Sequence, residues 1–257
     1  MSHPEQQAFL SIVARENVAL IKDAKVLEIG SYDVNGSVRR TFAAASEHVG
    51  VDLVEGPGVD RIGFGHEVVD ATGTYDITLS TECFEHDPHW RETFANMVRL
   101  TRPGGLVTFT CASRGRPEHG TQRTQPSMSP GTQFVGSDYY QNLTERDFSG
   151  FPLDDWFTAS RFWYVPTSFD LYFAGVRAGG PDGAVAARLP DGSSVAAIGR
   201  IMPRGHRLVR WPLRLALRGE SETAYQNRIL GYWKFVLRSG GLAAGIAPRI
   251  FRRDKSR

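Results

Sequence analysis

The chain has 257 residues, of which 41% are hydrophobic and 23% are charged. These fractions are typical of a globular protein and exclude a collagen-like, low-complexity or fully disordered chain. The length fits one large domain, or one domain with an appendage. Two cysteines, Cys83 and Cys111, lie in apolar, strand-like segments, which predicts buried, reduced thiols and no disulfide framework.

The sequence contains no apolar run of about 18 residues, the length that a membrane-spanning helix requires. Residues 1–21 mix charged side chains into an apolar pattern, unlike a signal peptide. We therefore expect a cytoplasmic protein.

Charge is distributed unevenly along the chain. Residues 1–177 hold 15 Lys and Arg against 23 Asp and Glu, whereas residues 178–257 hold 15 against 5. This asymmetry predicts that the two parts differ in partner or position. We accordingly expect a first domain over residues 1–178 and a basic, helical extension over residues 179–257.

Strand-like and helix-like segments alternate through the first half of the chain. Near-helical spacing of apolar residues predicts a helix from about Pro4 to about Ile21. Further helices are expected at 37–45 and 92–100, and strands at 25–29, 49–53, 59–62, 75–80 and 106–111. Such alternation implies crossover units and a parallel sheet.

The second half of the chain begins with a long polar segment. Residues 113–137 are rich in Gly, Pro, Ser and Thr and have no periodicity, which favours a lid or substrate loop. Residues 139–148 are predicted to be helical, and 157–164 with 168–177 to form an antiparallel hairpin. Basic helical stretches are expected at 208–217 and 222–237.

The ends of the first two predicted strands suggest a cofactor. Gly30 would let a ligand approach the backbone, and a carboxylate at Asp52 could accept hydrogen bonds from two ribose hydroxyls. A dinucleotide would need G-x-G-x-x-G, but the next glycine after Gly30 is Gly36, which disfavours an NAD-dependent oxidoreductase. The Glu28 carboxylate would repel a pyrophosphate, whereas it suits a cationic cofactor.

Four segments together resemble the motifs of the class I S-adenosylmethionine-dependent methyltransferases. They are VLEIG at 26–30, GVDL at 50–53, YDITLSTECFEH at 75–86 and LTRPGGL at 100–106. The resemblance covers about residues 24–178. It implies S-adenosyl-L-methionine as the cofactor and a Rossmann-like α/β fold. That fold has a mostly parallel seven-stranded sheet ending in an antiparallel hairpin, here followed by the basic helical appendage.

The resemblance also implies roles for individual residues. It assigns the methionine end of the cofactor to Glu28, Gly30, Ser31, Thr81 and Glu82, the ribose to Asp52, and adenine packing to Leu53. The sequence departs from the family in two places: the loop 31–36 lacks the usual second glycine, and the second crossover is shortened to 55–58. We take Gly65, His66 and Glu67 as the adenine candidates after the third strand.

Two histidines are candidates for the catalytic base. Methyl transfer to a hydroxyl requires alignment of the acceptor and removal of its proton, and histidine commonly does this near neutral pH. His86 follows the fourth strand and His119 lies in the long polar loop. Simpler explanations are a local hydrogen bond for His86 and a surface position for His119. Asp87 and His89 lack a distinctive ligand spacing, so we expect no metal ion.

The basic extension allows two interpretations. Arg204, Arg207, Arg210, Arg214 and Arg218 alternate with leucines and Trp211, and the C-terminus adds Arg252, Arg253 and Lys255. A basic amphipathic helix of this kind can lie on an anionic membrane or glycolipid surface. Alternatively, it caps the domain or a second subunit in a homodimer, with arginine stems covering apolar surface. No nucleic-acid-binding module accompanies the charge, so no nucleic-acid partner is expected.

The sequence thus predicts a methyltransferase that acts on a small-molecule or saccharide acceptor at a hydroxyl oxygen, in the cytoplasm or at the inner face of the membrane. One or two aromatic residues are expected to line the acceptor cleft. The candidates are Tyr139, Tyr140, Trp156, Trp163 and Tyr164. Alternatives are an N- or C-methyltransferase of a small metabolite, and a non-catalytic scaffold that keeps the fold.

Overall fold

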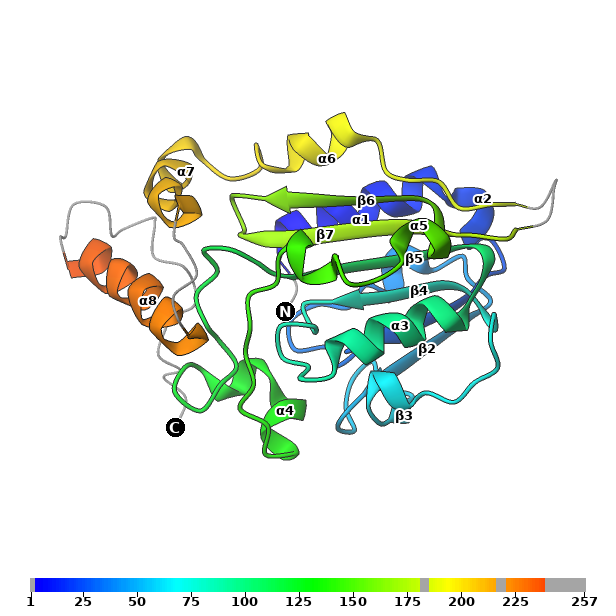
Figure 1. The fold of residues 1–257 in the computed structure, drawn as a ribbon, viewed down its shortest axis with the longest axis horizontal. Coiled ribbons are helices and arrows are strands. Elements are labelled where there is room, and N and C mark those ends of the chain that lie inside the picture. Colours follow the sequence, from blue (N-terminus) through cyan, green and yellow to red (C-terminus); the bar gives the residue numbers. More distant parts are fainter. Residues whose placement is uncertain (1–2, 181–184, 216–220, 239–257) are drawn as a thin grey trace.

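The structure, a computed structural model, describes residues 3–180, 185–215 and 221–238. One seven-stranded sheet has the order β3-β2-β1-β4-β5-β7-β6 (Figure 1). The strands are β1 (Lys25–Ile29), β2 (Glu47–Asp52), β3 (Arg61–Ile62), β4 (Tyr75–Thr81), β5 (Thr101–Ala112), β6 (Phe157–Val165) and β7 (Asp170–Arg177). Strands β1 to β5 pair in parallel, whereas β7 is antiparallel to β5 and β6. The predicted fold class is confirmed.

Helices cover both faces of this sheet. The α-helices are α1 (Pro4–Glu16), α2 (Val18–Ile21), α3 (Trp90–Leu100), α4 (Pro130–Phe134), α5 (Leu153–Trp156), α6 (Gly192–Ile198), α7 (Arg204–Arg210) and α8 (Glu222–Arg238). The 3-10 helices are η1 (Arg39–Phe42), η2 (Gly65–Glu67), η3 (Pro126–Met128), η4 (Glu145–Phe148) and η5 (Trp211–Leu215). Within the described residues, none of these helices is both long and apolar enough to cross a membrane.

Alternating side chains of the strands separate two hydrophobic cores. Val26 packs in the core beneath α1, α2 and α6, whereas its neighbour Leu27 packs in the core beneath α3. In β5, Leu106 likewise packs in the core beneath α1, α2 and α6, and Val107 packs in the core beneath α3. Because the central strands are buried on both faces, the sequence shows short, mostly apolar runs there.

Three predicted helices differ from the structure. The expected helix at 37–45 is wrong: only the 3-10 helix η1 forms before the chain enters β2. The expected helix at 139–148 is also wrong apart from η4, because its backbone bonds elsewhere: Gln141 donates to the Glu85 carbonyl and Leu143 to the Ala112 carbonyl. The first helix is interrupted at Asn17, whose side chain exchanges hydrogen bonds with the backbone of Arg188.

The described part of the extension packs against the rest of the chain. Val195 and Ile198 of α6 join the core beneath α1, so this segment belongs to the packing of the α/β unit. A smaller cluster joins Phe169, in the turn between β6 and β7, to residues of η5 and α8. This packing agrees with the cap interpretation. Arg218, Arg252, Arg253 and Lys255 lie outside the described residues.

A buried ionic network links four distant segments. Arg116, from the polar loop, lies 3.3 Å from Asp170 of β7 and 3.6 Å from Glu82 after β4. His3, the N-cap residue of α1, lies 2.8 Å from the same Asp170 carboxylate. Burial alone would lower the pKa of His3. The nearby carboxylates, above all Asp170, raise it by more than burial lowers it, so the net pKa lies well above the usual value. The imidazole is therefore protonated near neutral pH.

We expect His3→Gln to lower the free energy of unfolding by about 1.5–3 kcal/mol at pH 6, as for a lost hydrogen bond between charged groups. Because the pKa of His3 is higher in the folded than in the unfolded protein, its contribution to stability is complete at a pH below the unfolded pKa, about 6.5. This contribution disappears as the pH rises through the folded pKa. Denaturant titrations at pH 6 and pH 10 should therefore show a smaller difference at the higher pH. The exposed His89→Gln is the control. A pH-independent difference would contradict the assigned ion pair.

Candidate active site

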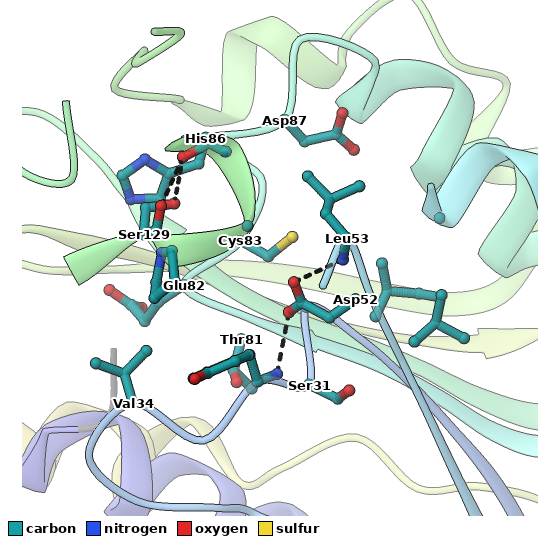
Figure 2. Close-up of a pocket in the computed structure, with 18 of the residues that line it drawn as sticks. Ser31, Val34, Asp52, Leu53, Thr81, Glu82, Cys83, His86, Asp87 and Ser129 are labelled. Atoms are coloured by element: carbon teal, nitrogen blue, oxygen red, sulfur yellow. Dashed lines mark hydrogen bonds between the residues drawn. The ribbon is translucent and has the colours of Figure 1, made fainter. Parts of the chain in front are cut away.

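The carboxyl ends of β1, β2 and β4 meet at a cleft of about 1000 Å³ that is open to solvent. Gly30, Asp52 and Thr81 stand at these three strand ends and line the cleft. Figure 2 shows Asp52 and Thr81 there. In open α/β sheets, ligands bind outside the carboxyl ends of the strands where neighbouring connections diverge. The sequence predicted a cofactor at the ends of these strands, and the cleft lies there.

Gly30 allows the β1 end to approach the turn after β4. Its φ is +77°, and a Cβ at this position would lie 2.5 Å from the Cβ of Cys83. A side chain would therefore be strained in conformation and would also collide with Cys83. Glycine at position 30 therefore lets the end of β1 lie directly against Cys83 at the floor of the cleft.

Asp52 presents a carboxylate that is already oriented by the backbone. One oxygen accepts a hydrogen bond from the Tyr32 amide at 3.0 Å, and the other accepts from the Leu53 amide at 2.7 Å. Burial raises the pKa of Asp52, although these two amides lower it in part. Each oxygen retains a further lone pair, so the group is suited to a pair of ligand hydroxyls.

Glu28 also lines the cleft, but its carboxylate has a protein partner. His48 Nε2 lies 2.9 Å from Glu28 Oε2, and burial raises the pKa of Glu28. The sequence did not indicate His48, which lies on the neighbouring β2 and faces Glu28 across the strand pair. Its contribution is to hold a buried carboxylate in place beside the cleft.

Glu82 supplies a fully buried negative charge at the inner end of the cleft. It has a positive φ of 51°, and its side chain faces Arg116 and His3. Burial alone would raise the pKa of Glu82, but these two cations lower it well below its ordinary range. The carboxylate is therefore ionised. Sequence reasoning identified Glu82 and missed its partners, which come from distant segments.

The two predicted catalytic histidines lie next to each other. His86 lines the cleft, and His119 lies behind it with the ring centroids 5.0 Å apart and the planes at 82°. Burial lowers the pKa of His86 to about 3 and that of His119 well below its ordinary value, so both rings are uncharged. Glu85 Oε1 lies 4.0 Å from His119 Nε2, and burial together with Glu82 raises the pKa of Glu85.

Glu85 was missed by the sequence reasoning. Its signal was present in the segment Glu82–His86, where two acidic residues and a histidine follow a strand end. The spacing alone did not show that His119 would join them from a loop on the far side of β5.

The polar loop covers the cleft. Residues of η3 and α4 line it from above, and a Cβ on Gly131 would lie 2.8 Å from an Asp52 carboxylate oxygen. The side-chain amide of Gln133 donates to the Gly120 carbonyl, which connects this cover to the segment that carries His119. The predicted lid therefore lies over the Asp52 end of the cleft.

Helix α8 holds the part of the loop that carries His119. The Gly115 amide donates to the Tyr225 hydroxyl at 2.8 Å, and the Glu118 amide donates to the Gln226 side chain at 2.9 Å. Both Tyr225 and Gln226 are buried. The basic extension thus contributes directly to the position of the loop, which the charge pattern did not suggest.

Most of the predicted cofactor residues line the cleft, and two do not. The lining includes Glu28, Gly30, Ser31, Asp52, Leu53, Thr81 and Glu82. Of the three adenine candidates, Gly65 lines the cleft beside Phe64, whereas His66 and Glu67 do not. The reason is that Gly65 packs against Ile29 and Thr93, where a Cβ would be 2.6 Å from Ile29, and η2 turns the next two side chains away. His66 instead packs against His89 with centroids 4.4 Å apart.

The predicted aromatic platform is also not part of the cleft. None of Tyr139, Tyr140, Trp156, Trp163 and Tyr164 belongs to its lining. Tyr140 contacts His86 and His119 edge-on from behind, and Trp163 packs against Phe9 of α1. The other three lie outside the cleft as well.

No protein-family model and no curated protein sequence matches this chain. Solved structures do align with it. One is the 1,6-didemethyltoxoflavin-N1-methyltransferase of Burkholderia thailandensis, crystallised with S-adenosylhomocysteine, at 19% identity over 68% of this chain and 80% of that chain, with a TM-score of 0.46.

Two further structures align at similar levels. An S-adenosylmethionine-dependent methyltransferase from Mesorhizobium loti is 13% identical over 63% of this chain and 94% of that chain, with a TM-score of 0.43. An O-methyltransferase family protein from Burkholderia thailandensis is 15% identical over 68% of this chain and 57% of that chain, with a TM-score of 0.43. The strand order β3-β2-β1-β4-β5-β7-β6, with β7 antiparallel to β5, shows that the chain has the class I methyltransferase fold.

We expect Gly30→Ala to destabilise the protein by at least about 2 kcal/mol, because the substitution adds a strained φ and a collision with Cys83. The matched control is Gly63→Ala, another glycine of the cleft, which has no atom within 4 Å of the added Cβ. It should change stability by less than about 0.5 kcal/mol. Equal thermal unfolding of the two variants would show that β1 and the β4 turn are not in close contact.

Proposed function

We propose that the protein is an S-adenosylmethionine-dependent methyltransferase that methylates a hydroxyl oxygen of a small-molecule or saccharide acceptor. The observation that carries this proposal is the cleft at the strand ends, with the amide-oriented Asp52 carboxylate at one end and the ionised Glu82 at the other. Figure 2 shows Asp52 and Glu82 on opposite sides of the cleft.

The charges and shapes of the lining fit the cofactor. Asp52 has free lone pairs for two ribose hydroxyls, and Leu53 with Phe64 offers apolar surface for adenine. Glu82 provides negative charge for the cationic methionine end, where a pyrophosphate would be repelled. When bound, S-adenosylmethionine would supply an electrophilic methyl group; the protein would position it and exclude water beneath the lid.

The acceptor would occupy the end of the cleft beside His86. This ring is uncharged, so it offers one nitrogen lone pair at this end of the cleft. A strongly lowered pKa nevertheless makes His86 a weak base by itself. The group behind it, Glu85 with His119, would therefore take part in activating the acceptor.

Two alternatives remain distinct from this proposal. An N- or C-methyltransferase of a small metabolite would use the same cofactor cleft with a different acceptor. A non-catalytic scaffold would bind the cofactor product but turn over no acceptor. Screening acceptors by release of S-adenosylhomocysteine separates the enzymes from the scaffold, and the position of the new methyl group in the product separates O- from N- or C-methylation.

We expect Asp52→Ala to weaken binding of S-adenosylhomocysteine by about 1–3 kcal/mol, since two ribose hydroxyls would lose their buried partner. Asp154→Ala, at an exposed position on α5, is the matched control and should leave binding unchanged. Calorimetric titration of both variants gives the comparison. If Asp52→Ala bound as tightly as the control, the ribose assignment would be wrong.

We further propose that α7 and η5 form a peripheral membrane contact at the inner face of the membrane. Leu208, Trp211 and Leu215 are 74%, 55% and 62% exposed, which is unusual for three large apolar side chains so close in sequence. Arg204 and Arg214 are exposed in the same segment, which supports an anionic lipid surface as the partner. The opposite side, through Leu213, packs in the cluster with α8.

We expect the protein to sediment with vesicles that contain phosphatidylglycerol, and the double variant Leu208→Glu/Trp211→Glu to remain in solution. The matched control is Val69→Glu, which places the same charge at a site that is 91% exposed in another part of the molecule. Failure of the wild-type protein to bind such vesicles would exclude the membrane contact. A dimer seen by light scattering and lost in the double variant would assign the surface to a second subunit.

A further inference from the structure

Three buried side chains at the inner end of the cleft are arranged like a ligand set. One ligand atom from each of Glu85, His86 and His119 lies within 4.8 Å of the other two. Glu85 and His86 come from the turn after β4, whereas His119 comes from the polar loop that α8 holds in place. The grouping is thus produced by the tertiary structure.

The potential ligand atoms have no partner of their own. Both carboxylate oxygens of Glu85, Nδ1 of His86 and Nε2 of His119 are buried without a hydrogen bond among the described residues. A buried polar group left unsatisfied costs about 1–3 kcal/mol, so four such atoms in one place require an explanation. A bound ion would satisfy them together.

A hydrogen bond of His119 fixes which ring nitrogen carries the proton, and it leaves the other nitrogen free for an ion. Its Nδ1 lies 3.0 Å from the Pro117 carbonyl oxygen and must donate its proton to that acceptor. Nε2 consequently carries a free lone pair, and it is the atom that faces Glu85 at 4.0 Å. Metal-binding imidazoles are typically oriented by such a bond from the second ring nitrogen to a carbonyl.

We propose that Glu85, His86 and His119 bind a divalent transition-metal ion at the inner end of the cleft. Two imidazoles and one carboxylate suit Mn²⁺, Fe²⁺, Co²⁺ or Zn²⁺, whereas Mg²⁺ and Ca²⁺ favour sites made of oxygen atoms alone. The expectation of no metal was based on the sequence spacing of Asp87 and His89, which do not belong to this group.

A second group of similar composition illustrates the distinction. His3, Glu82 and Asp170 also lie within reach of one another. There, however, the carboxylates already face Arg116 and the protonated His3, which would repel a metal ion. In the described chain no Lys or Arg forms an ion pair with Glu85, and Arg116 acts on it only at longer range, so the competition at this site is weaker.

The site also narrows the acceptor class, an extension that rests on the proposed function. His86 lines the cleft and the buried ligand atoms lie directly behind it, so an ion at this site would be next to the acceptor end of the cleft. Three protein ligands leave room for two oxygens, which fits an acceptor with adjacent oxygen atoms, such as a vicinal diol.

The test is stoichiometric metal binding by the full chain. After dialysis against a chelator, titration with Mn²⁺, Co²⁺ and Zn²⁺ should give one bound ion per chain for at least one of them. Glu85→Gln and His119→Gln should each weaken that binding at least about tenfold, as expected when a ligand is lost. The control His89→Gln, at an exposed position outside this group, should leave it unchanged.

The visible spectrum of the wild-type protein with Co²⁺ provides a measurement independent of the variants, should these fail to fold. We expect ligand-field bands of nitrogen and oxygen coordination without a thiolate charge-transfer band. Such a band would place the ion on Cys83, which also lines the cleft, and would overturn the proposal. So would the absence of one-to-one binding of all three ions, or loss of binding in a control variant alone.

Parallel titration with S-adenosylhomocysteine separates this proposal from the proposed function. Metal binding without S-adenosylhomocysteine binding would overturn the methyltransferase function and leave the metal site standing. S-adenosylhomocysteine binding without metal binding would overturn only the metal site.

Discussion

The arrangement of the site depends on the ion pairs of the buried Arg116 guanidinium. The guanidinium lies between the carboxylates of Asp170 and Glu82, with His3 completing the network. Charges removed from water are tolerated only when paired, and removal of one partner leaves the others uncompensated. One cation therefore connects the start of α1, the turn after β4, the polar loop and β7. It also keeps Glu82 ionised at the inner end of the cleft.

This constraint extends to the C-terminal part of the chain. The same loop that carries Arg116 is held by Tyr225 and Gln226 of α8, and its next residues bring His119 to His86. Parallel strand ends provide the cofactor side of the cleft, a general property of this architecture. The acceptor side instead depends on a helix that follows the sheet in sequence, so the basic extension and the candidate chemistry are structurally linked.

The cofactor side was predictable from sequence because its signals are local. An apolar run ending at Gly30 and another ending at Asp52 fix where two parallel strands stop, and both residues line the cleft. The helix at 139–148 did not form, and the adenine candidates His66 and Glu67 do not line the cleft, because tertiary contacts decided both: backbone pairing with Glu85 in one case, and the packing of Gly65 in the other. The meeting of Glu85 with His119 depends on loop geometry, which periodicity does not encode.

Binding of S-adenosylhomocysteine to the unmodified protein tests the central claim most directly. Isothermal calorimetry should give one-to-one binding with micromolar affinity, since the Asp52 carboxylate is already oriented at the cleft and the buried charge of Glu82 lies in its wall. Absence of binding to both S-adenosylhomocysteine and S-adenosylmethionine would contradict the account. The cleft would then belong to a protein that keeps the methyltransferase fold without its cofactor.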